Sequence, residues 1–330
     1  MTLNLKLLWL NNSTVCILVP FHKCIFTSLR ENVIFSVMTK LKTKVGISIF
    51  ILTLLAYIPW YFSSMVLYPN INCTKEHHVY CGTPKEINLI FETVAIQNPE
   101  GLTLESWYIP SPGSNKGIIF VHGHGGTKNE GLRFASALHK EGFNLLALSL
   151  RRNSGSFASM GFYEPEDVIA AIDYLIKDKK LTSIGLFGFS MGAATSIIAM
   201  EKDPRVRASI FSSGYASAID VMSESAKRDF GIPYYPLIPI VRSVLDLRGN
   251  MKIETVIPEK SISQISPRPI SIFHCDKDDY VDVSHANRLF AAAKEPKELW
   301  IPTCSKHEQI WNTNKEEAEK RSVDFFKRNL

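Results

Sequence analysis

Short apolar runs alternate with longer amphipathic segments along most of this chain. The runs are typical of buried strands, and the segments that follow them carry apolar residues three or four positions apart, as helices do. Strands are predicted at 90–96, 102–109, 117–121, 144–149, 183–188, 207–211, 269–273 and 298–301, and helices at 129–141, 164–178, 191–202, 284–293 and 314–328. This alternation predicts an α/β fold class, with a doubly wound, mostly parallel sheet covered on both faces.

One apolar run precedes this pattern and is much longer than a strand. No residue from Val45 to Tyr68 is charged. As a helix this run is about 36 Å long, enough to cross a hydrocarbon core of about 30 Å. Trp60 suits a membrane–water boundary, and Pro59 is expected to kink or end the helix. The pattern predicts a transmembrane helix over 45–68, with a cleaved signal peptide and a buried amphipathic helix as the alternatives.

The positive charge of the chain is concentrated before this run. The formal net charge is +5, and residues 1–44 contain six basic residues and one acidic residue. Lys40, Lys42 and Lys44 lie directly before the run, so the positive-inside rule predicts a cytoplasmic amino terminus and an extracytoplasmic main domain. The remainder is neutral, with 31 of the 37 basic and 31 of the 32 acidic residues. It has no basic face for phosphates, so nucleic acid is not expected as a partner.

These patterns divide the chain into four parts. Residues 1–44 form a basic extension, 45–68 the membrane helix, 69–85 a linker and 86–330 the main domain. Met38 precedes three lysines and the apolar run, as a natural start would. Residues 1–37 are therefore expected to be an upstream extension from a misplaced start, and no function is assigned to them.

A candidate nucleophile lies between the strand at 183–188 and the helix at 191–202. The sequence there is Gly188-Phe189-Ser190-Met191-Gly192. A strand that turns sharply into a helix leaves no room for side chains two positions before and after the serine, so both glycines are needed. Ser190 is expected to adopt a strained, bridge-like conformation with its hydroxyl exposed. A glycine-flanked serine in an ordinary turn is the alternative.

A serine hydroxyl becomes nucleophilic when a histidine accepts its proton and a carboxylate orients that histidine. His307 lies in a loop just past the last predicted strand and is the candidate base. The candidate acids follow the strand at 269–273, and they are Asp276, Asp278, Asp279 and Asp282. The residues alone leave the choice among these four open.

A glycine-rich loop, His122-Gly123-His124-Gly125-Gly126, follows the strand at 117–121. Glycines let the backbone pass close to a substrate carbonyl, so that an N–H group can point at the developing negative charge. The N–H of Met191 is expected to supply a second donor. The histidine side chains are expected to pack the loop. No metal is expected, because no carboxylate or cysteine follows at ligand spacing, and no organic cofactor is needed.

These motifs, in this order, resemble the α/β-hydrolase superfamily over about residues 86–330. Within it the chain is similar to the serine aminopeptidase-like and acyl-transferase-like branch, which includes single-pass membrane-anchored proteins. His274 and Val281 fit the family's frame around the acid. The resemblance therefore implies Asp278 as the acid, with Asp276 as the fallback. It also implies the backbone N–H of His124 as the first oxyanion donor.

The strand–helix rhythm breaks over an insert at about 214–266. In the family that the chain resembles, such an insert usually forms a lid over the site. Its segment 232–241 is apolar and rich in proline. This segment is expected to pack the insert onto the main domain, with a wall for an acyl chain as the alternative.

Six cysteines are too few for a disulfide scaffold. Cys73 and Cys81 follow the membrane helix and could pair on an oxidising side of the membrane. Cys275 and Cys304 lie at predicted strand ends, where pairing is one alternative. Buried free thiols are the expectation there.

Together these features predict a membrane-tethered serine hydrolase that cleaves a carboxylic ester through an acyl-enzyme on Ser190. A peptidase or thioesterase of the same fold is the nearest alternative. A catalytically silent interaction module is the alternative from another class. The expected partner is a small-molecule or lipid-like acyl substrate, and the oligomeric state is left open.

Overall fold

The computed structural model describes residues 6–11, 14–19, 23–27, 31–71, 73 and 81–330. They divide into two compact units, one up to Ile58 and the other from Pro59 to Leu330. The first unit holds most of helix α1 (Glu31–Leu67) and a three-stranded antiparallel sheet. That sheet consists of β1 (Lys6–Asn11), β2 (Thr14–Val19) and β3 (Lys23–Thr27). No strand was predicted in this region.

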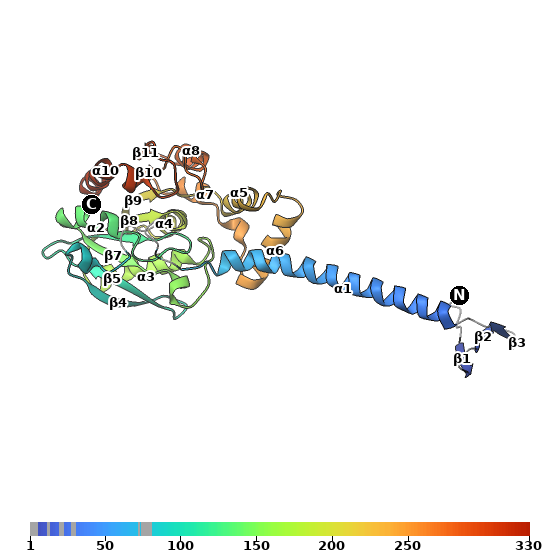
Figure 1. Ribbon diagram of the computed structural model, residues 1–330. Helices are drawn as coiled ribbons and strands as arrows, with labels where there is room; N and C mark the ends of the chain where they lie inside the picture. Colours follow the sequence, from blue (N-terminus) through green and yellow to red (C-terminus); the bar gives the residue numbers. More distant parts are fainter. Residues whose placement is uncertain (1–5, 12–13, 20–22, 28–30, 72, 74–80) are drawn as a thin grey trace. The chain divides into compact units, whose positions relative to one another are not determined.

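The described part of the second unit is built on an eight-stranded sheet with the order β11-β10-β9-β8-β6-β7-β5-β4 (Figure 1). Its strands are β4 (Glu92–Gln97), β5 (Thr103–Ile109), β6 (Lys116–Val121), β7 (Asn144–Leu148), β8 (Ser183–Phe189), β9 (Val206–Ser212), β10 (Ile270–Phe273) and β11 (Lys297–Trp300). All neighbours from β7 to β11 are parallel, and β5 pairs antiparallel with both β4 and β7. The predicted α/β class and its mostly parallel sheet are confirmed.

Helices cover both faces of this sheet and bury it. One face packs against α3 (Glu164–Lys177), α4 (Met191–Lys202) and α8 (Val283–Ala292), and the other against α2 (Leu132–Lys140) and α10 (Lys315–Asn329). In β6, Ile119 and Val121 join the first core while Ile118 and Phe120 join the second. Successive strand residues point to opposite faces, so a strand covered on both sides is apolar at every position. The continuous runs in the sequence have this origin.

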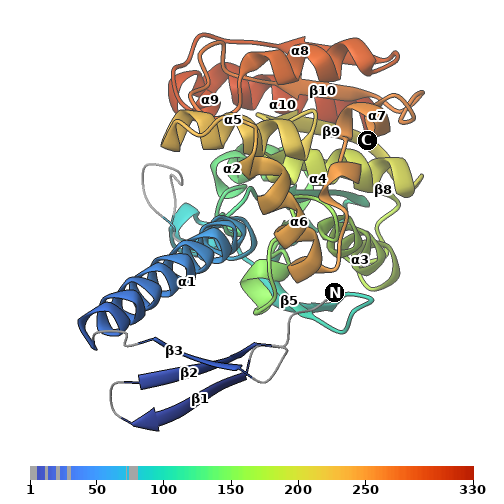
Figure 2. The same cartoon turned by 90° about the vertical axis from the view of Figure 1, so that its right-hand side faces the viewer.

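The insert is helical, which explains the lost strand–helix rhythm. It contains α5 (Ala218–Phe230), α6 (Leu237–Gly249), η3 (Ile253–Thr255) and α7 (Pro258–Ile262) (Figure 2). The Ser217 side chain caps the start of α5, and Gly231 ends it with a φ of +66°. In the proline-rich segment, Ile238 is buried, whereas Tyr235 is 74% exposed. Part of this segment therefore packs on the domain, and part faces outward.

Helix α1 does not end at Pro59 but continues to Leu67. In the second unit its residues Pro59, Ser63 and Leu67 are buried, at intervals of four positions. Residues four apart lie on one helix face, so this face packs against the α/β domain. Among the described residues, α1 is the one helix long and apolar enough to cross a membrane, over Phe35–Leu67 with a mean hydropathy of 1.9.

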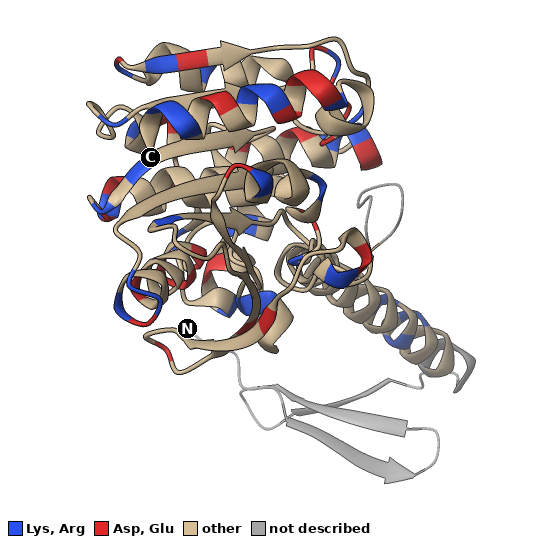
Figure 3. Ribbon diagram, turned by 90° about the vertical axis from the view of Figure 1, so that its left-hand side faces the viewer, with Lys and Arg blue, Asp and Glu red and all other residues tan. Residues whose placement is uncertain are grey.

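Basic and acidic side chains alternate over the α/β domain (Figure 3). Arg288, for example, pairs with Asp220 at 2.8 Å and with Glu259 at 2.6 Å. Such interleaving matches the neutral charge balance of this part of the chain.

Two disulfides lie in the second unit, Cys73–Cys81 and Cys275–Cys304. The expectation of free thiols at 275 and 304 was therefore wrong. The neighbouring parallel strands β10 and β11 end side by side, and this brings the two Cα atoms to 5.1 Å, a distance that a disulfide can bridge.

Candidate active site

Ser190 occupies the turn between the end of β8 at Phe189 and the start of α4 at Met191. Its φ is +52° and its ψ is −118°, so the backbone lies on the positive-φ side and not in the expected bridge region. A non-glycine residue held in such a conformation costs about 1–3 kcal/mol, which the surrounding packing must offset. The turn projects the serine hydroxyl past the carboxyl end of the sheet.

The two glycines of the motif let three backbone segments meet at this turn. A Cβ atom on Gly188 would lie 2.4 Å from the carbonyl oxygen of Gly192. A Cβ atom on Gly192 would lie 2.0 Å from the carbonyl oxygen of Val121, at the end of β6. Any side chain at either position would collide with backbone that cannot move aside.

Ser190, His307 and Asp278 form one hydrogen-bonded chain. The Ser190 Oγ lies 2.8 Å from the His307 Nε2. The His307 Nδ1 lies 2.9 Å from Oδ2 and 3.0 Å from Oδ1 of Asp278. The three residues follow β8, β11 and β10, whose carboxyl ends share one edge of the sheet, where open α/β sheets bind ligands.

The other three candidate acids have separate partners. The Asp276 carboxylate accepts the Cys304 N–H at 3.0 Å, and the Asp279 carboxylate accepts the backbone N–H of His307 at 2.8 Å. Asp282 caps α8 by accepting the Ser284 N–H at 2.9 Å. Of the four aspartates, only Asp278 bonds the His307 ring in this part of the structure.

The Asp278 carboxylate is buried, and protein N–H groups provide its hydrogen bonds. Its side chain has no exposed surface, and its Oδ1 accepts the N–H groups of Tyr280 and Val281, each at 2.9 Å. Burial by itself would raise the Asp278 pKa, but the bond and charge of His307 outweigh it, so the pKa is lowered. The group is therefore an anion at neutral pH.

This anion determines the protonation of His307. A carboxylate only accepts hydrogen bonds, so Nδ1 carries the ring proton and Nε2 presents a lone pair to the Ser190 hydroxyl. Burial would lower the His307 pKa, yet the bond to Asp278 and its charge outweigh burial and raise it. The ring is thus held in the tautomer that can accept the serine proton.

The loop of residues 122–126 passes close to Ser190. A Cβ atom on Gly123 would lie 3.1 Å from the Ser190 Cβ, and His124, Ser190 and Met191 line one pocket. Met191 is the first residue of α4, so its N–H has no acceptor within the helix. The two residues expected to supply the oxyanion donors thus line the same cavity as Ser190.

The side chains of both loop histidines bond to backbone groups. The His122 Nε2 accepts the Leu150 N–H at 3.1 Å, and its Nδ1 lies 2.9 Å from the Gly123 carbonyl oxygen. The His124 Nε2 donates to the Val66 carbonyl at 2.7 Å. Burial lowers the His124 pKa, so this ring is neutral.

Comparisons with known proteins agree with this architecture. Residues 117–236 match the family model described as alpha/beta hydrolase fold. The esterase Pf2001 of Pyrococcus furiosus superposes with a TM-score of 0.65 at 23% identity, over 80% of this chain and 98% of the esterase. The chain has the α/β-hydrolase fold.

Relatives by sequence match most of this chain. The uncharacterized protein YqkD of Bacillus subtilis is 26% identical over 238 residues, which cover 70% of this chain and 77% of YqkD. The alpha/beta hydrolase domain-containing protein WAV2 of Arabidopsis thaliana is 25% identical over 269 residues, which cover 76% of this chain and 82% of WAV2. A shared fold leaves the reaction to be argued from the site residues.

A buried ionic cluster behind the site of this α/β-hydrolase domain was not predicted. The Arg133 Nη2, from α2, lies 2.8 Å from the Glu308 carboxylate and 3.4 Å from the Glu130 carboxylate. Glu130 also accepts the Gly123 N–H at 2.7 Å. The cluster therefore joins the glycine-rich loop to the residue next to His307. Burial raises the pKa of Glu308 to about 7, against the opposing charge of Arg133.

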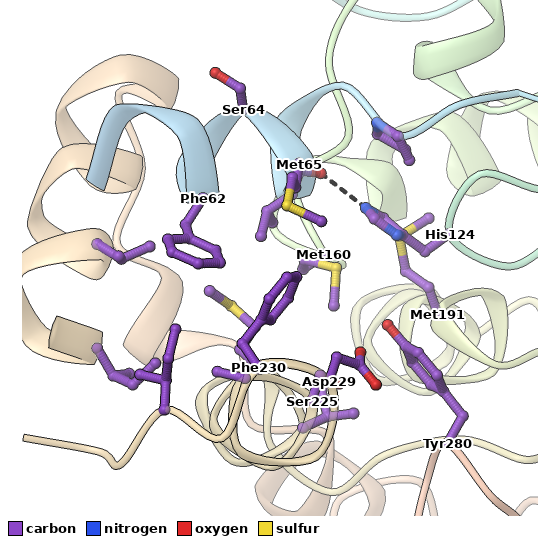
Figure 4. Close-up of a pocket in the computed structure, with 18 of the residues that line it drawn as sticks. Phe62, Ser64, Met65, His124, Met160, Met191, Ser225, Asp229, Phe230 and Tyr280 are labelled. Atoms are coloured by element: carbon purple, nitrogen blue, oxygen red, sulfur yellow. Dashed lines mark hydrogen bonds between the residues drawn. The ribbon is translucent and has the colours of Figure 1, made fainter. Parts of the chain in front are cut away.

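The pocket above Ser190 has a volume of about 590 Å³. This lies within the range of about 300–1,000 Å³ typical of ligand sites. Its walls come from the glycine-rich loop, from α5 and α6 of the insert, and from the end of α1. In Figure 4, Phe62 and Met65 extend from α1 into this pocket, and Phe230 of α5 lies across from them. The contribution of α1 to the pocket wall was not predicted from the sequence.

Proposed function

We propose that this protein is a serine hydrolase that cleaves carboxylic esters through an acyl-enzyme on Ser190. The observation that carries the proposal is the hydrogen-bonded chain from Ser190 through His307 to the anionic Asp278. It supplies a nucleophile, a base and an orienting carboxylate in contact, which is the arrangement that activates a serine.

In the first half of the reaction, the Ser190 Oγ attacks the ester carbonyl and its proton passes to the His307 Nε2. The carbonyl oxygen becomes an anion, which the N–H groups of His124 and Met191 stabilise. The His307 imidazolium then donates its proton to the departing alkoxide, so that an alcohol leaves and an acyl-enzyme remains. Asp278 stabilises the imidazolium and keeps its orientation.

In the second half, water replaces the alcohol. It gives a proton to the His307 Nε2 as its oxygen attacks the acyl-enzyme, and the same proton returns to the Ser190 Oγ when the acid departs. The carbon–oxygen bond of the ester is replaced by one to water oxygen. No electron transfer and no further reactant are needed.

An ester is the favoured substrate because the pocket lining is mostly apolar. Its side chains are chiefly methionine, aromatic and aliphatic, with Asp229 as the one carboxylate among the lining residues that the structure describes. A peptidase of this fold would need groups that hold a peptide amine and its polar backbone. An apolar lining instead suits an acyl chain, and an esterase is among the proteins of similar fold.

The protein is further proposed to be tethered through α1, with its hydrolase domain on the extracytoplasmic side. The apolar helix and the lysines before it support this orientation. The disulfides Cys73–Cys81 and Cys275–Cys304 agree with it, because disulfides persist in oxidising compartments.

A fluorophosphonate probe tests the assignment of Ser190. The full chain in detergent should be labelled, and Ser190→Ala should not be, because the probe requires an activated serine. Ser225→Ala is the matched control, since Ser225 lines the same pocket but is not one of the hydrogen-bonded residues of the Ser190–His307–Asp278 chain in the described part of the structure. Equal labelling of Ser190→Ala and the wild type would remove the proposal.

A further inference from the structure

The last two turns of α1 are built into the pocket wall. Phe62, Met65 and Val66 line the same cavity as Ser190, and Figure 4 shows Phe62 and Met65 there. Ser63 and Leu67, on the neighbouring face of the helix, are buried against the domain. Both faces of this segment are thus in use. One packs the helix onto the domain, and the other forms part of the cavity.

The insert holds this helix end through Arg248 of α6. The Arg248 Nη1 donates to the Trp60 carbonyl at 2.9 Å and lies 2.6 Å from the Ser63 Oγ and 2.7 Å from the Ser64 Oγ. The guanidinium also lies 3.8 Å from the centre of the Trp60 ring, a cation–π contact. The helix end and the insert therefore form one side of the pocket together.

Two loops of the α/β domain also hold the end of this segment. A helix leaves its last carbonyl groups without partners inside the helix. Here the Val66 carbonyl accepts from the His124 ring at 2.7 Å, and the Leu67 carbonyl accepts the Ala158 N–H at 2.8 Å. The residue that borders the oxyanion position is thus bonded directly to the helix that forms the pocket wall.

The length of the uncharged run indicates where the α1 part of the pocket wall would lie relative to a membrane. From Val45 to Ile58 it has 14 residues, which extend about 21 Å as a helix, less than a hydrocarbon core of about 30 Å. Crossing such a core takes about 20 residues, which brings the span to the region of Ser64. The helical turn that carries Phe62 would then lie at the membrane boundary.

Exposed apolar side chains on the insert and on the helix end suit such a boundary. Trp60 is 54% exposed, Tyr235 74% and Leu247 83%. Aromatic residues are enriched where a membrane meets water, and exposed apolar groups mark surfaces that meet lipid or protein.

We propose that the substrate is a membrane lipid ester whose acyl chain enters the pocket along the last two turns of α1. The chain lies against Phe62 and Met65, and its ester carbonyl reaches Ser190. This inference rests on the proposed hydrolytic function and adds the substrate class and its source. It assigns the helix end a role in specificity beyond tethering.

The chain-length test uses the full chain in phosphatidylcholine vesicles with 4-nitrophenyl butanoate and octanoate. Each buried methylene contributes about 0.8 kcal/mol, which is about fourfold in kcat/KM, so the four extra methylenes of octanoate should favour it by about two hundredfold. Equal rates for the two esters would overturn the lipid inference and leave the proposed function intact. No cleavage of either ester, with no fluorophosphonate labelling, would remove the proposed function itself.

Two variants of the α1 pocket wall should change the preference for longer acyl chains in opposite directions. Met65→Trp adds bulk to the cavity and should lower the octanoate-to-butanoate ratio by about tenfold or more. Phe62→Ala enlarges the cavity and should raise the ratio of dodecanoate to octanoate by about fourfold. Ile90→Trp is the matched control, because this side chain is 84% exposed on the α/β domain and lies outside the cavity, and it should keep the wild-type ratio. An unchanged ratio in both folded wall variants would contradict the inference.

The source of the acyl chain is tested by offering it in two forms. Dioctanoyl phosphatidylcholine in vesicles should be cleaved faster than octanoyl-coenzyme A supplied in water. Faster cleavage of the soluble thioester would overturn the membrane source.

Discussion

Asp278→Asn tests the chemistry of the site at one atom. The Asp278 Oδ1 accepts two backbone N–H groups, so the asparagine carbonyl oxygen should take this position. The amide NH2 then replaces Oδ2, 2.9 Å from the His307 Nδ1. The carbonyl oxygen stays 3.0 Å from Nδ1 but already accepts two backbone N–H groups, whereas the NH2 group can only donate. Pairing of Nδ1 with this donor places the ring proton on Nε2. The Nε2–H would face the Ser190 hydroxyl and could not accept its proton.

The expected loss of catalytic rate in Asp278→Asn is large, although few atoms change. The corresponding substitution in serine proteases lowers kcat by about 10⁴, which is about 5.5 kcal/mol of transition-state stabilisation. Hydrolysis of 4-nitrophenyl butanoate should fall by about this factor, and the rate of fluorophosphonate labelling should fall with it. Thermal unfolding should show that the variant remains folded, because the backbone bonds to Oδ1 are kept.

Asp276→Asn is the matched control, because its carboxylate bonds the Cys304 N–H and lies outside the Ser190–His307–Asp278 chain. Its activity should stay within about twofold of the wild type, the range expected away from the site. A folded Asp278→Asn variant that keeps a tenth of the activity would refute the tautomer argument. So would an equal loss in Asp276→Asn.

Three further outcomes are expected. The wild-type kcat/KM should rise with pH, with a midpoint above about 6.5. His307 must be neutral to accept a proton, and its carboxylate partner raises its pKa. A midpoint well below 6 in a pH–rate profile would contradict this. The Arg151 Nη2 lies 2.9 Å from the carboxylate of Asp167, and both side chains are buried. Arg151→Met should therefore lower the free energy of unfolding by about 3–5 kcal/mol in denaturant at pH 8, because it leaves the buried Asp167 charge without a cationic partner. The loss should be smaller at pH 5.5, because burial already raises the Asp167 pKa to about 6 and protonation removes the charge; equal losses at both pH values would count against the argument. Gly192→Ala should abolish fluorophosphonate labelling and sharply lower the melting temperature, because its Cβ would lie 2.0 Å from the Val121 carbonyl; near-normal labelling would show that the turn can relax.

The sequence by itself determined the strands of the main sheet, the helices that cover it and the turn at Ser190. A strand buried on both faces is apolar throughout, so the β6 and β8 runs were visible without any tertiary information. The need for Gly188 and Gly192 was visible for a similar reason, because a sharp strand-to-helix turn crowds its own neighbours. Both signals depend on residues close together in the chain.

Among the four aspartates, the residues alone left the choice open. Asp278 was selected through a resemblance, and the structure brings its carboxylate to the His307 ring. A spacing of two or three residues decides which side chain turns inward, and only the path of the loop after β10 sets that direction. The sequence therefore limited the candidates, and the fold separated them.

Contacts between distant segments were decided by the tertiary structure. Arg133 meets Glu308 across 175 positions, and Arg248 meets Ser63 across 185. Nothing in the local pattern around either arginine indicates its partner, because the pairing depends on how separate elements pack. The same holds for the disulfide Cys275–Cys304, which exists because β10 and β11 are neighbours. The composition of the apolar run indicated a membrane helix, whereas packing alone made its last two turns a wall of the site.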